Sequence, residues 1–300
     1  MLRFKPHYEM KPWGSRRFES CFSRELPEGS VGESWELFEL EGRGSVVESG
    51  KREGEALGEL WRSGLRGGSG EGPFPFLLKW LDTSEQMSVQ VHPDAEFCEN
   101  TQCGPPKTEA WLVAEVEPKS KLLIGNYPGL DPQTLVQAVE RGTLEKWMYE
   151  TVPRPGDMYL VEAGTLHSVG AGFLLLEVQQ PSDVTFRLYD WGRKDEKGEE
   201  RELMVEQATA CVHYDRFDLP RPRKKEVEGP SFRMQLLGMG ARVEPNQLRV
   251  FAAHKGAVRL LAEGSEYELG YGDILVAEVS DGPISVASGS CAFISEPTSA

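Results

Sequence analysis

Many short strand-like segments, separated by turns that contain Gly and Asp, limit what this chain can fold into. Residues 154–192 read RPGDMYLVEAGTLHSVGAGFLLLEVQQPSDVTFRLYDWG, with strands of about five to seven residues. Residues 231–300 continue the pattern, with turns at Glu263-Gly264, at residues 270–273 and at Asp281-Gly282. Short strands at intervals of about 8–12 residues are typical of β-sandwiches and β-barrels. We therefore predict a mainly β fold with few helices.

One segment breaks this pattern with helical spacing. In DPQTLVQAVERGTLEKWM, residues 131–148, the apolar residues Leu135, Val139 and Leu144 recur near the period of an α-helix. Asp131 followed by Pro132 is a good pair for the N-cap and the first helical position. The sequence predicts a helical segment over about 131–148.

A weak internal repeat bears on domain organisation. PGDMYLVEAGTLH (155–167) and YGDILVAEV (271–279) share a Gly-Asp step and a following apolar strand, and only the first keeps a histidine. The repeat suggests two related β domains, which a length of 300 residues allows. The charged, Pro-rich segment 215–230 is interpreted as a linker. We expect an N-terminal domain over 1–214 and a C-terminal domain over 231–300.

Charge and cysteine usage limit the partners and the compartment. The formal net charge of −15 argues against nucleic acid as the main partner, because phosphate backbones need Lys and Arg. A locally positive pocket could still hold a small anion. The odd number of cysteines and the polar, Pro-rich start favour a cytoplasmic protein with reduced thiols, Cys98 and Cys103 among them. No apolar run approaches the ~20 residues of a membrane helix, so no membrane partner is expected.

The segment SVQVHPD (88–94) places two polar side chains on one face of a strand. Gln90 and His92 are two residues apart and therefore point to the same side. Glu109 follows at the start of the next strand, and His167 follows a tight Gly turn in AGTLHSVG. An amide oxygen, a carboxylate and two imidazoles form a ligand set for zinc or a similar divalent ion. Such a site suits a reaction that develops negative charge on oxygen, and positive charge is added by Lys79, Lys107 and Arg187.

These motifs together resemble a known family. KPWG (11–14), GESWE (32–36), SVQVHPD, PPKTEAW (105–111), EAGTLHSVGAG (162–172) and EVQQPSDVTFRLYDWGR (177–193) resemble type I mannose-6-phosphate isomerase in its shorter bacterial form. The resemblance covers most of residues 5–195, in order. It implies a mainly β double cupin, that is, two jelly-roll β-barrels, with a short helical insertion. It also implies aldose–ketose isomerase activity and one Zn²⁺ per chain, held by Gln90, His92, Glu109 and His167.

Two features qualify the resemblance. Glu162 stands before AGT, where the family usually has proline, which puts the shape of this loop in question. The tail, residues 215–300, matches only by general type, and we expect it to form a second, metal-free cupin.

The resemblance also assigns catalytic roles. Interconversion of mannose 6-phosphate and fructose 6-phosphate moves a proton between C2 and C1, through a cis-enediol. Arg187 matches the family's catalytic arginine and would stabilise the enediolate or hold the phosphate. Lys107 resembles a family residue beside the sugar, and Glu177 is the expected base. Alternatively, Glu177 is a buried structural partner of Arg187 with no catalytic role.

Two other functions stay open at this point. A cupin oxygenase would bind iron through two histidines and a carboxylate. A non-enzymatic sugar-binding or regulatory cupin would bind a sugar phosphate without turnover. Lys107 and Arg187 favour the isomerase, because an oxygenase has no general need for these cations. The expected partner is a sugar-phosphate substrate, and the expected assembly is a monomer or a homodimer.

Overall fold

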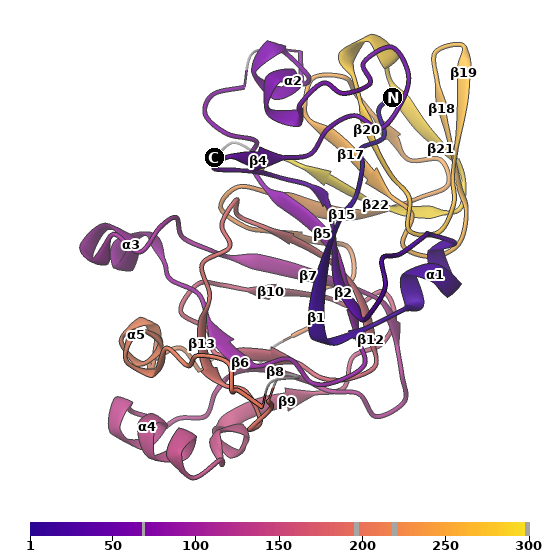
Figure 1. Ribbon diagram of the computed structural model, residues 1–300. Helices are drawn as coiled ribbons and strands as arrows, with labels where there is room; N and C mark the ends of the chain where they lie inside the picture. Colours follow the sequence, from indigo (N-terminus) through magenta and orange to yellow (C-terminus); the bar gives the residue numbers. More distant parts are fainter. Residues whose placement is uncertain (68–69, 195–197, 218–220, 298–300) are drawn as a thin grey trace.

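Antiparallel strands form most of the protein, so the predicted mainly β class is confirmed. The computed structural model describes residues 1–67, 70–194, 198–217 and 221–297 (Figure 1). Two sheets build the N-terminal part. In pairing order the first contains β1 (His7–Ser15), β2 (Val31–Leu37), β5 (Leu77–Thr83), β12 (Phe173–Gln179), β7 (Glu109–Val116) and β10 (Met158–Val161). The second contains β13 (Phe186–Tyr189), β6 (Val89–Val91), β11 (His167–Val169), β8 (Leu122–Asn126) and β9 (Met148–Thr151).

Two further sheets build the C-terminal part, as a double cupin requires. One contains β14 (Glu226–Glu228), β15 (Arg233–Gly238), β22 (Ser290–Ser295), β17 (Arg249–Ala252) and β20 (Ile274–Ala277). The other contains β16 (Arg242–Val243), β21 (Ile284–Ser288), β18 (Val258–Ala262) and β19 (Ser265–Leu269). A small hairpin joins β3 (Glu39–Leu40) to β4 (Arg43–Gly44).

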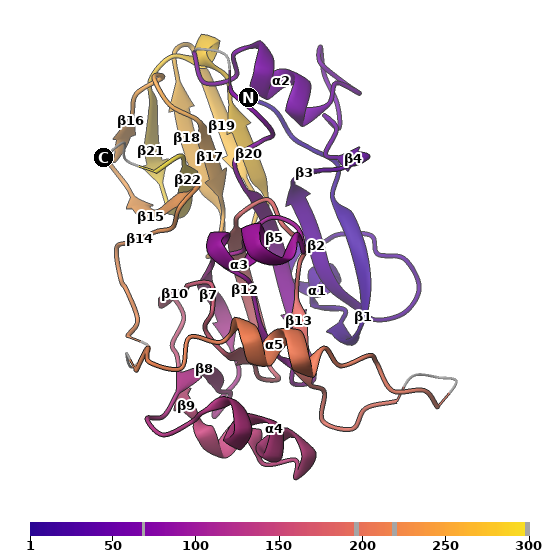
Figure 2. The same ribbon diagram turned by 90° about the vertical axis from the view of Figure 1, so that its left-hand side faces the viewer.

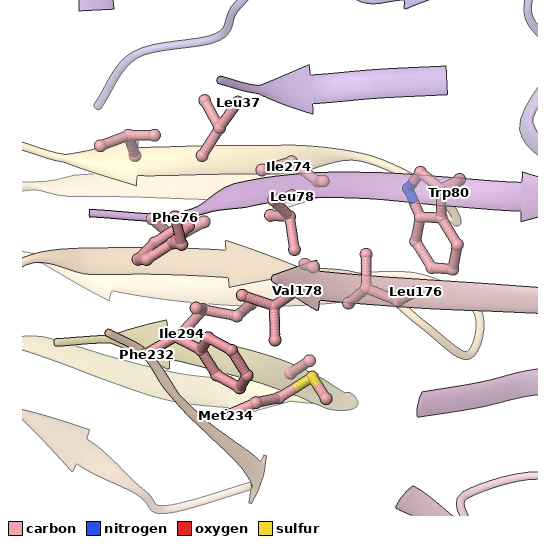
Figure 3. Close-up of a cluster of buried hydrophobic side chains, with 14 of the residues drawn as sticks. Leu37, Phe76, Leu78, Trp80, Leu176, Val178, Phe232, Met234, Ile274 and Ile294 are labelled. Atoms are coloured by element: carbon pink, nitrogen blue, oxygen red, sulfur yellow. The ribbon is translucent and has the colours of Figure 1, made fainter. Parts of the chain in front are cut away.

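The alternation of side chains along β5 and β12 explains how these layers pack. Leu78 and Leu176 point to the face that packs on the C-terminal sheet, where they meet Met234, Ile274 and Ile294 (Figure 3). The intervening positions point into the N-terminal sheet pair, because successive side chains of a strand face opposite sides. They include Leu81, Leu175 and the register partners Lys79 and Glu177. One sheet therefore serves two cores, and its inner face carries the charged groups described below.

The two halves of the internal repeat occupy equivalent places. Gly156 precedes β10 and Gly272 precedes β20, and each glycine has a φ of +87°, which disfavours any residue with a Cβ. The amide of Gly156 donates to Val113 and that of Gly272 to Ala253. β10 and β20 are each the last strand of their sheet. The same turn thus starts an edge strand in both parts.

The described residues also form five α-helices and two 3₁₀ helices, which connect the strands. Figure 2 shows α3, α4 and α5 on one side of the N-terminal part. Their bounds are α1 (Arg17–Phe22), α2 (Leu57–Ser63), α3 (Ala95–Thr101), α4 (Pro132–Glu140), α5 (Val205–Cys211), η1 (Leu144–Trp147) and η2 (Val279–Asp281).

The predicted helical segment 131–148 corresponds to two helices. Asp131 caps α4 by accepting a hydrogen bond from the amide of Thr134 at 2.7 Å. Gly142, with a φ of +61°, ends the helical path before η1 begins. Leu135 and Leu144 are nevertheless buried in one cluster, so the apolar spacing correctly marked the packed face.

The sheet of the C-terminal part involves residues outside the predicted domain 231–300. The segment interpreted as a linker, 215–230, contains β14, and residues 218–220 of it lie outside the described residues. At the start of the chain, Leu2 pairs with Val276 of β20. The division at 214 and 231 stays a prediction. In the structure, β14 of the segment 215–230 belongs to the C-terminal sheet, and Leu2 pairs with the last strand of that sheet. Among the described ranges, no helix is long and apolar enough to cross a membrane.

Candidate metal centre and cavity

The predicted ligands come from three strands of the N-terminal part. Gln90 lies in β6, and His92 follows its end. Glu109 is the first residue of β7, and His167 is the first residue of β11. In the sheet register, Gln90 lies opposite both His167 and Arg187. Strand pairing therefore brings together positions that are far apart in the sequence.

Three of the four predicted ligands form a tight, buried cluster. The Nε2 atom of His92 is 3.3 Å from Oε2 of Glu109, and Nε2 of His167 is 3.4 Å from Oε1 of the same carboxylate. The candidate ligand atoms of all three residues lie within 4.8 Å of one another. Each residue is only 1% exposed. Gln90, the fourth predicted ligand, lines a cavity beside the cluster, which is described below.

The hydrogen bonds of the two imidazoles fit a metal ion. Nδ1 of His92 is 3.0 Å from the Val184 carbonyl oxygen, and Nδ1 of His167 is 2.9 Å from that of Thr165. A carbonyl can only accept, so each Nδ1 carries the proton and each neutral ring turns the lone pair of Nε2 inward. Nε2 of His167 and Oε1 of Glu109 have no hydrogen-bond partner, whereas the Lys107 ammonium contacts Oε2 of Glu109 and Nε2 of His92. Acceptors that face acceptors in a buried place are the arrangement that a divalent cation satisfies.

Burial and nearby charges keep this cluster in the protonation state that a metal needs. Burial, with the Lys107 ammonium nearby, lowers the pKa of His92 to about 3. Burial also lowers the pKa of His167. For Glu109, burial opposes ionisation, but Lys107 and the imidazoles hold its pKa well below the usual range. The site thus offers two neutral imidazoles and one carboxylate at neutral pH.

Lys107 contacts the cluster directly. Its Nζ atom lies 2.9 Å from Oε2 of Glu109 and 3.2 Å from Nε2 of His92, and the side chain is buried. Lys107 and Glu109 are two residues apart, and their side chains meet. Lys107 also lines the cavity, so its ammonium lies between the cluster and the space where a ligand would bind.

A cavity of about 380 Å³ opens beside the cluster. Arg187 lines it, and the Nε atom of Arg187 has no hydrogen-bond partner. Burial, together with the neighbouring Arg201 charge, lowers the pKa of Arg187. Six basic residues border the cavity against three acidic ones, so the lining is positive in an acidic protein: Lys11, Arg43, Lys79, Lys107, Arg187 and Arg201 against Glu9, Glu33 and Asp183. Such a lining attracts anions.

Glu177 lies deeper than Arg187 and has other partners. Its Oε1 is 3.1 Å from Nζ of Lys79, and its Oε2 accepts a hydrogen bond from Nε1 of Trp111 at 2.9 Å. The alternative that paired it with Arg187 named the wrong cation, because Lys79 faces Glu177 directly across β5 and β12. Burial, and then the charge of Glu109, raises the pKa of Glu177. Glu177 does not line the cavity.

Glu33 and its neighbours are site residues that the sequence did not single out. Oε2 of Glu33 accepts from Nε1 of Trp35 at 2.7 Å and lies 3.3 Å from Nζ of Lys79. Burial opposes its ionisation, but Lys79 and Lys11 lower the pKa of Glu33 to about 2. The available signal was the motif GESWE, which places two carboxylates in a strand that is buried along its whole length. A charge in such a strand needs a partner.

Comparisons with known proteins agree with this geometry. A family model described as phosphomannose isomerase type I, catalytic domain, matches residues 1–122. A mannose-6-phosphate isomerase of Bacillus subtilis (strain 168) is 36% identical over 216 residues, which are 70% of this chain and 67% of that protein. The mannose-6-phosphate isomerase of Streptococcus mutans is 34% identical over 200 residues, 66% of this chain and 63% of that protein. A crystal structure of mannose 6-phosphate isomerase from Bacillus subtilis has a TM-score of 0.86 at 28% identity and 99% coverage of both chains.

Proposed function

The chain belongs to the mannose-6-phosphate isomerase family, and from that premise we propose that it interconverts mannose 6-phosphate and fructose 6-phosphate. One observation carries the proposal. The buried cluster of His92, Glu109 and His167 adjoins a cavity in which basic side chains outnumber acidic ones by six to three. A volume of about 380 Å³ lies in the range of small-ligand sites.

We propose one Zn²⁺ per chain, held by His92, Glu109, His167 and Gln90. The inward lone pairs of the imidazoles and the Glu109 oxygen that has no hydrogen-bond partner, Oε1, support this set. The neutral nitrogen and amide donors leave the ion only partly neutralised by the single carboxylate. When bound, zinc would supply Lewis-acid stabilisation of negative charge on the sugar oxygens.

The basic residues of the cavity would bind and orient the substrate. Arg187 offers a guanidinium fork that matches phosphate or an enediolate oxygen. A hydrogen bond of 3.1 Å from its guanidinium to the Glu202 carbonyl oxygen holds the group in place and leaves Nε available. Lys107 would hold a sugar oxygen beside the cluster, because its ammonium reaches both the cavity and the ligand residues.

Proton transfer between C2 and C1 requires a base, and Glu177 remains our proposal for it. Its raised pKa brings the carboxylate closer to the value that general-base catalysis favours. Glu177 does not line the cavity but pairs with Lys79, which does, so it would act from beside the Lys79 ammonium. A Glu177→Gln variant with full zinc content and nearly unchanged turnover would exclude this role.

A single assay tests the proposal as a whole. Zinc-loaded protein is incubated with fructose 6-phosphate under nitrogen, and mannose 6-phosphate is measured before chelation, after it and after zinc is restored. We expect turnover that chelation abolishes and zinc restores. A requirement for oxygen, with iron bound, would point to the oxygenase instead. Binding of the sugar phosphate without turnover at full metal occupancy would point to the sugar-binding cupin.

We further propose a cytoplasmic protein, monomeric or homodimeric, whose partner is the sugar phosphate and not nucleic acid or a membrane. The odd number of cysteines supports a reducing compartment.

A further inference from the structure

A short loop, residues 162–165, contacts both histidines of the candidate metal centre. The amide of Gly164 donates to the carbonyl oxygen of His92 at 2.8 Å. The carbonyl oxygen of Thr165 accepts from Nδ1 of His167 at 2.9 Å. A displacement of this loop would therefore move one ligand directly and rotate the ring of the other.

A third histidine connects this loop to the helix that follows His92. Nε2 of His213 lies 2.8 Å from Oδ2 of Asp94, and the other oxygen of Asp94 caps α3 by accepting from the amide of Phe97 at 2.8 Å. The amide of His213 also donates to the carbonyl oxygen of Gly164 at 2.9 Å. His213 thus contacts the segments on both sides of the metal centre.

Arg216 closes this arrangement. It donates to Nδ1 of His213 at 3.1 Å and to the carbonyl oxygen of Ala163 at 3.0 Å, and its guanidinium is 3.4 Å from Glu162. Because Arg216 can only donate and the ionised Asp94 can only accept, the ring of His213 is neutral, with its proton on Nε2. The position before the AGT motif, where a proline would stiffen the loop, is instead held by this ion pair.

Gly164 allows the ring of His213 to lie this close. Its φ is +79°, and a Cβ at this position would lie 2.5 Å from the ring. Two independent features of the loop, its backbone conformation and its missing side chain, therefore accommodate His213.

We propose that His213 is a positioning residue for the metal centre, which ties the loop before His167 to the helix after His92. This proposal rests on the zinc site proposed above. The side chains of His213, Asp94 and Arg216 are about one-third exposed, so their hydrogen bonds contribute little to global stability. Their effect falls on the orientation of the ligands, and loss of such outer contacts typically weakens metal binding by about 10- to 100-fold.

The test compares zinc affinity with the stability of the metal-free protein. Wild type, His213→Ala, His213→Gln and Arg216→Ala are titrated against a chromophoric zinc chelator, and the thermal unfolding of each metal-free protein is recorded. We expect zinc to bind about 10- to 100-fold more weakly to His213→Ala and about tenfold more weakly to Arg216→Ala. The glutamine variant should recover most of the affinity, because its amide can donate to Asp94 and accept from Arg216.

A matched control separates positioning from general destabilisation. His254 is a buried histidine of the C-terminal part, and His254→Ala should lower the unfolding temperature without changing zinc affinity. Zinc affinity of His213→Ala within threefold of wild type would overturn the positioning role and leave the zinc site standing. Absence of zinc binding in wild type would overturn both proposals. If His213→Ala does not fold, Arg216→Ala decides, and unchanged affinity in that variant refutes the role.

Discussion

Replacing Lys79 with methionine would remove the only ammonium that lies between two buried carboxylates of the described structure. Nζ of Lys79 is 3.3 Å from Oε2 of Glu33 and 3.1 Å from Oε1 of Glu177. The three side chains are at most 9% exposed. At an effective dielectric constant of about 20, each pair attracts by about 5 kcal/mol before the cost of desolvation is subtracted. Removing one partner of a buried pair typically costs about 3–5 kcal/mol, because a charge is left without compensation.

We therefore expect Lys79→Met to lower the free energy of unfolding by about 3–5 kcal/mol. The double variant Lys79→Met/Glu177→Gln should be more stable than Lys79→Met alone, because the glutamine leaves no unpaired charge at position 177. Urea unfolding of the four proteins of this cycle, followed by tryptophan fluorescence, measures the coupling energy. Trp111 and Trp35 contact the two carboxylates and report on this region. A loss below about 1 kcal/mol, or a coupling energy near zero, would refute the reasoning.

Three further predictions concern single side chains. Glu33 has a folded pKa of about 2, below its ordinary value of about 4.5, so its contribution to stability is present above pH 4.5 and is lost as pH falls toward 2. Glu33→Gln should reduce the change in unfolding free energy between pH 4.5 and pH 2 by about 3 kcal/mol. Parallel profiles of unfolding free energy against pH for wild type and variant would contradict the prediction. Gly164→Ala should weaken zinc binding, whereas Gly156→Ala, which has a similar positive φ but no atom within 4 Å of its Cβ, should cost about 1–2 kcal/mol of stability alone. Equal zinc affinities would argue against contact with His213. Arg187→Lys should reduce kcat/KM by about 100-fold without changing zinc content, because the bidentate guanidinium fork is lost. Steady-state kinetics and metal analysis measure both quantities, and a kcat/KM close to that of wild type would contradict the prediction.

The local pattern of residues correctly indicated the mainly β class and the helical segment at 131–148, but not the helices α1, α2 and α3. Turn residues and short apolar runs predicted the strands, and the Asp131-Pro132 pair predicted the start of α4. These inferences succeeded because they depend on backbone periodicity and capping, which act within a few residues.

The tertiary structure decided which distant charges became partners. Nothing in the spacing of Glu177 and Arg187 indicated that Glu177 would pair with Lys79, because that choice depends on the register between β12 and β5. The contact between Asp94 and His213 joins residues 119 apart in the chain, and the accommodating glycine lies in a third segment. A single sequence specifies which residues can share a strand face, but the pairing of strands determines which faces meet. In a buried site the free energy of a charged side chain depends on which partner the strand pairing places beside it, because an unpaired ion is costly where water is excluded.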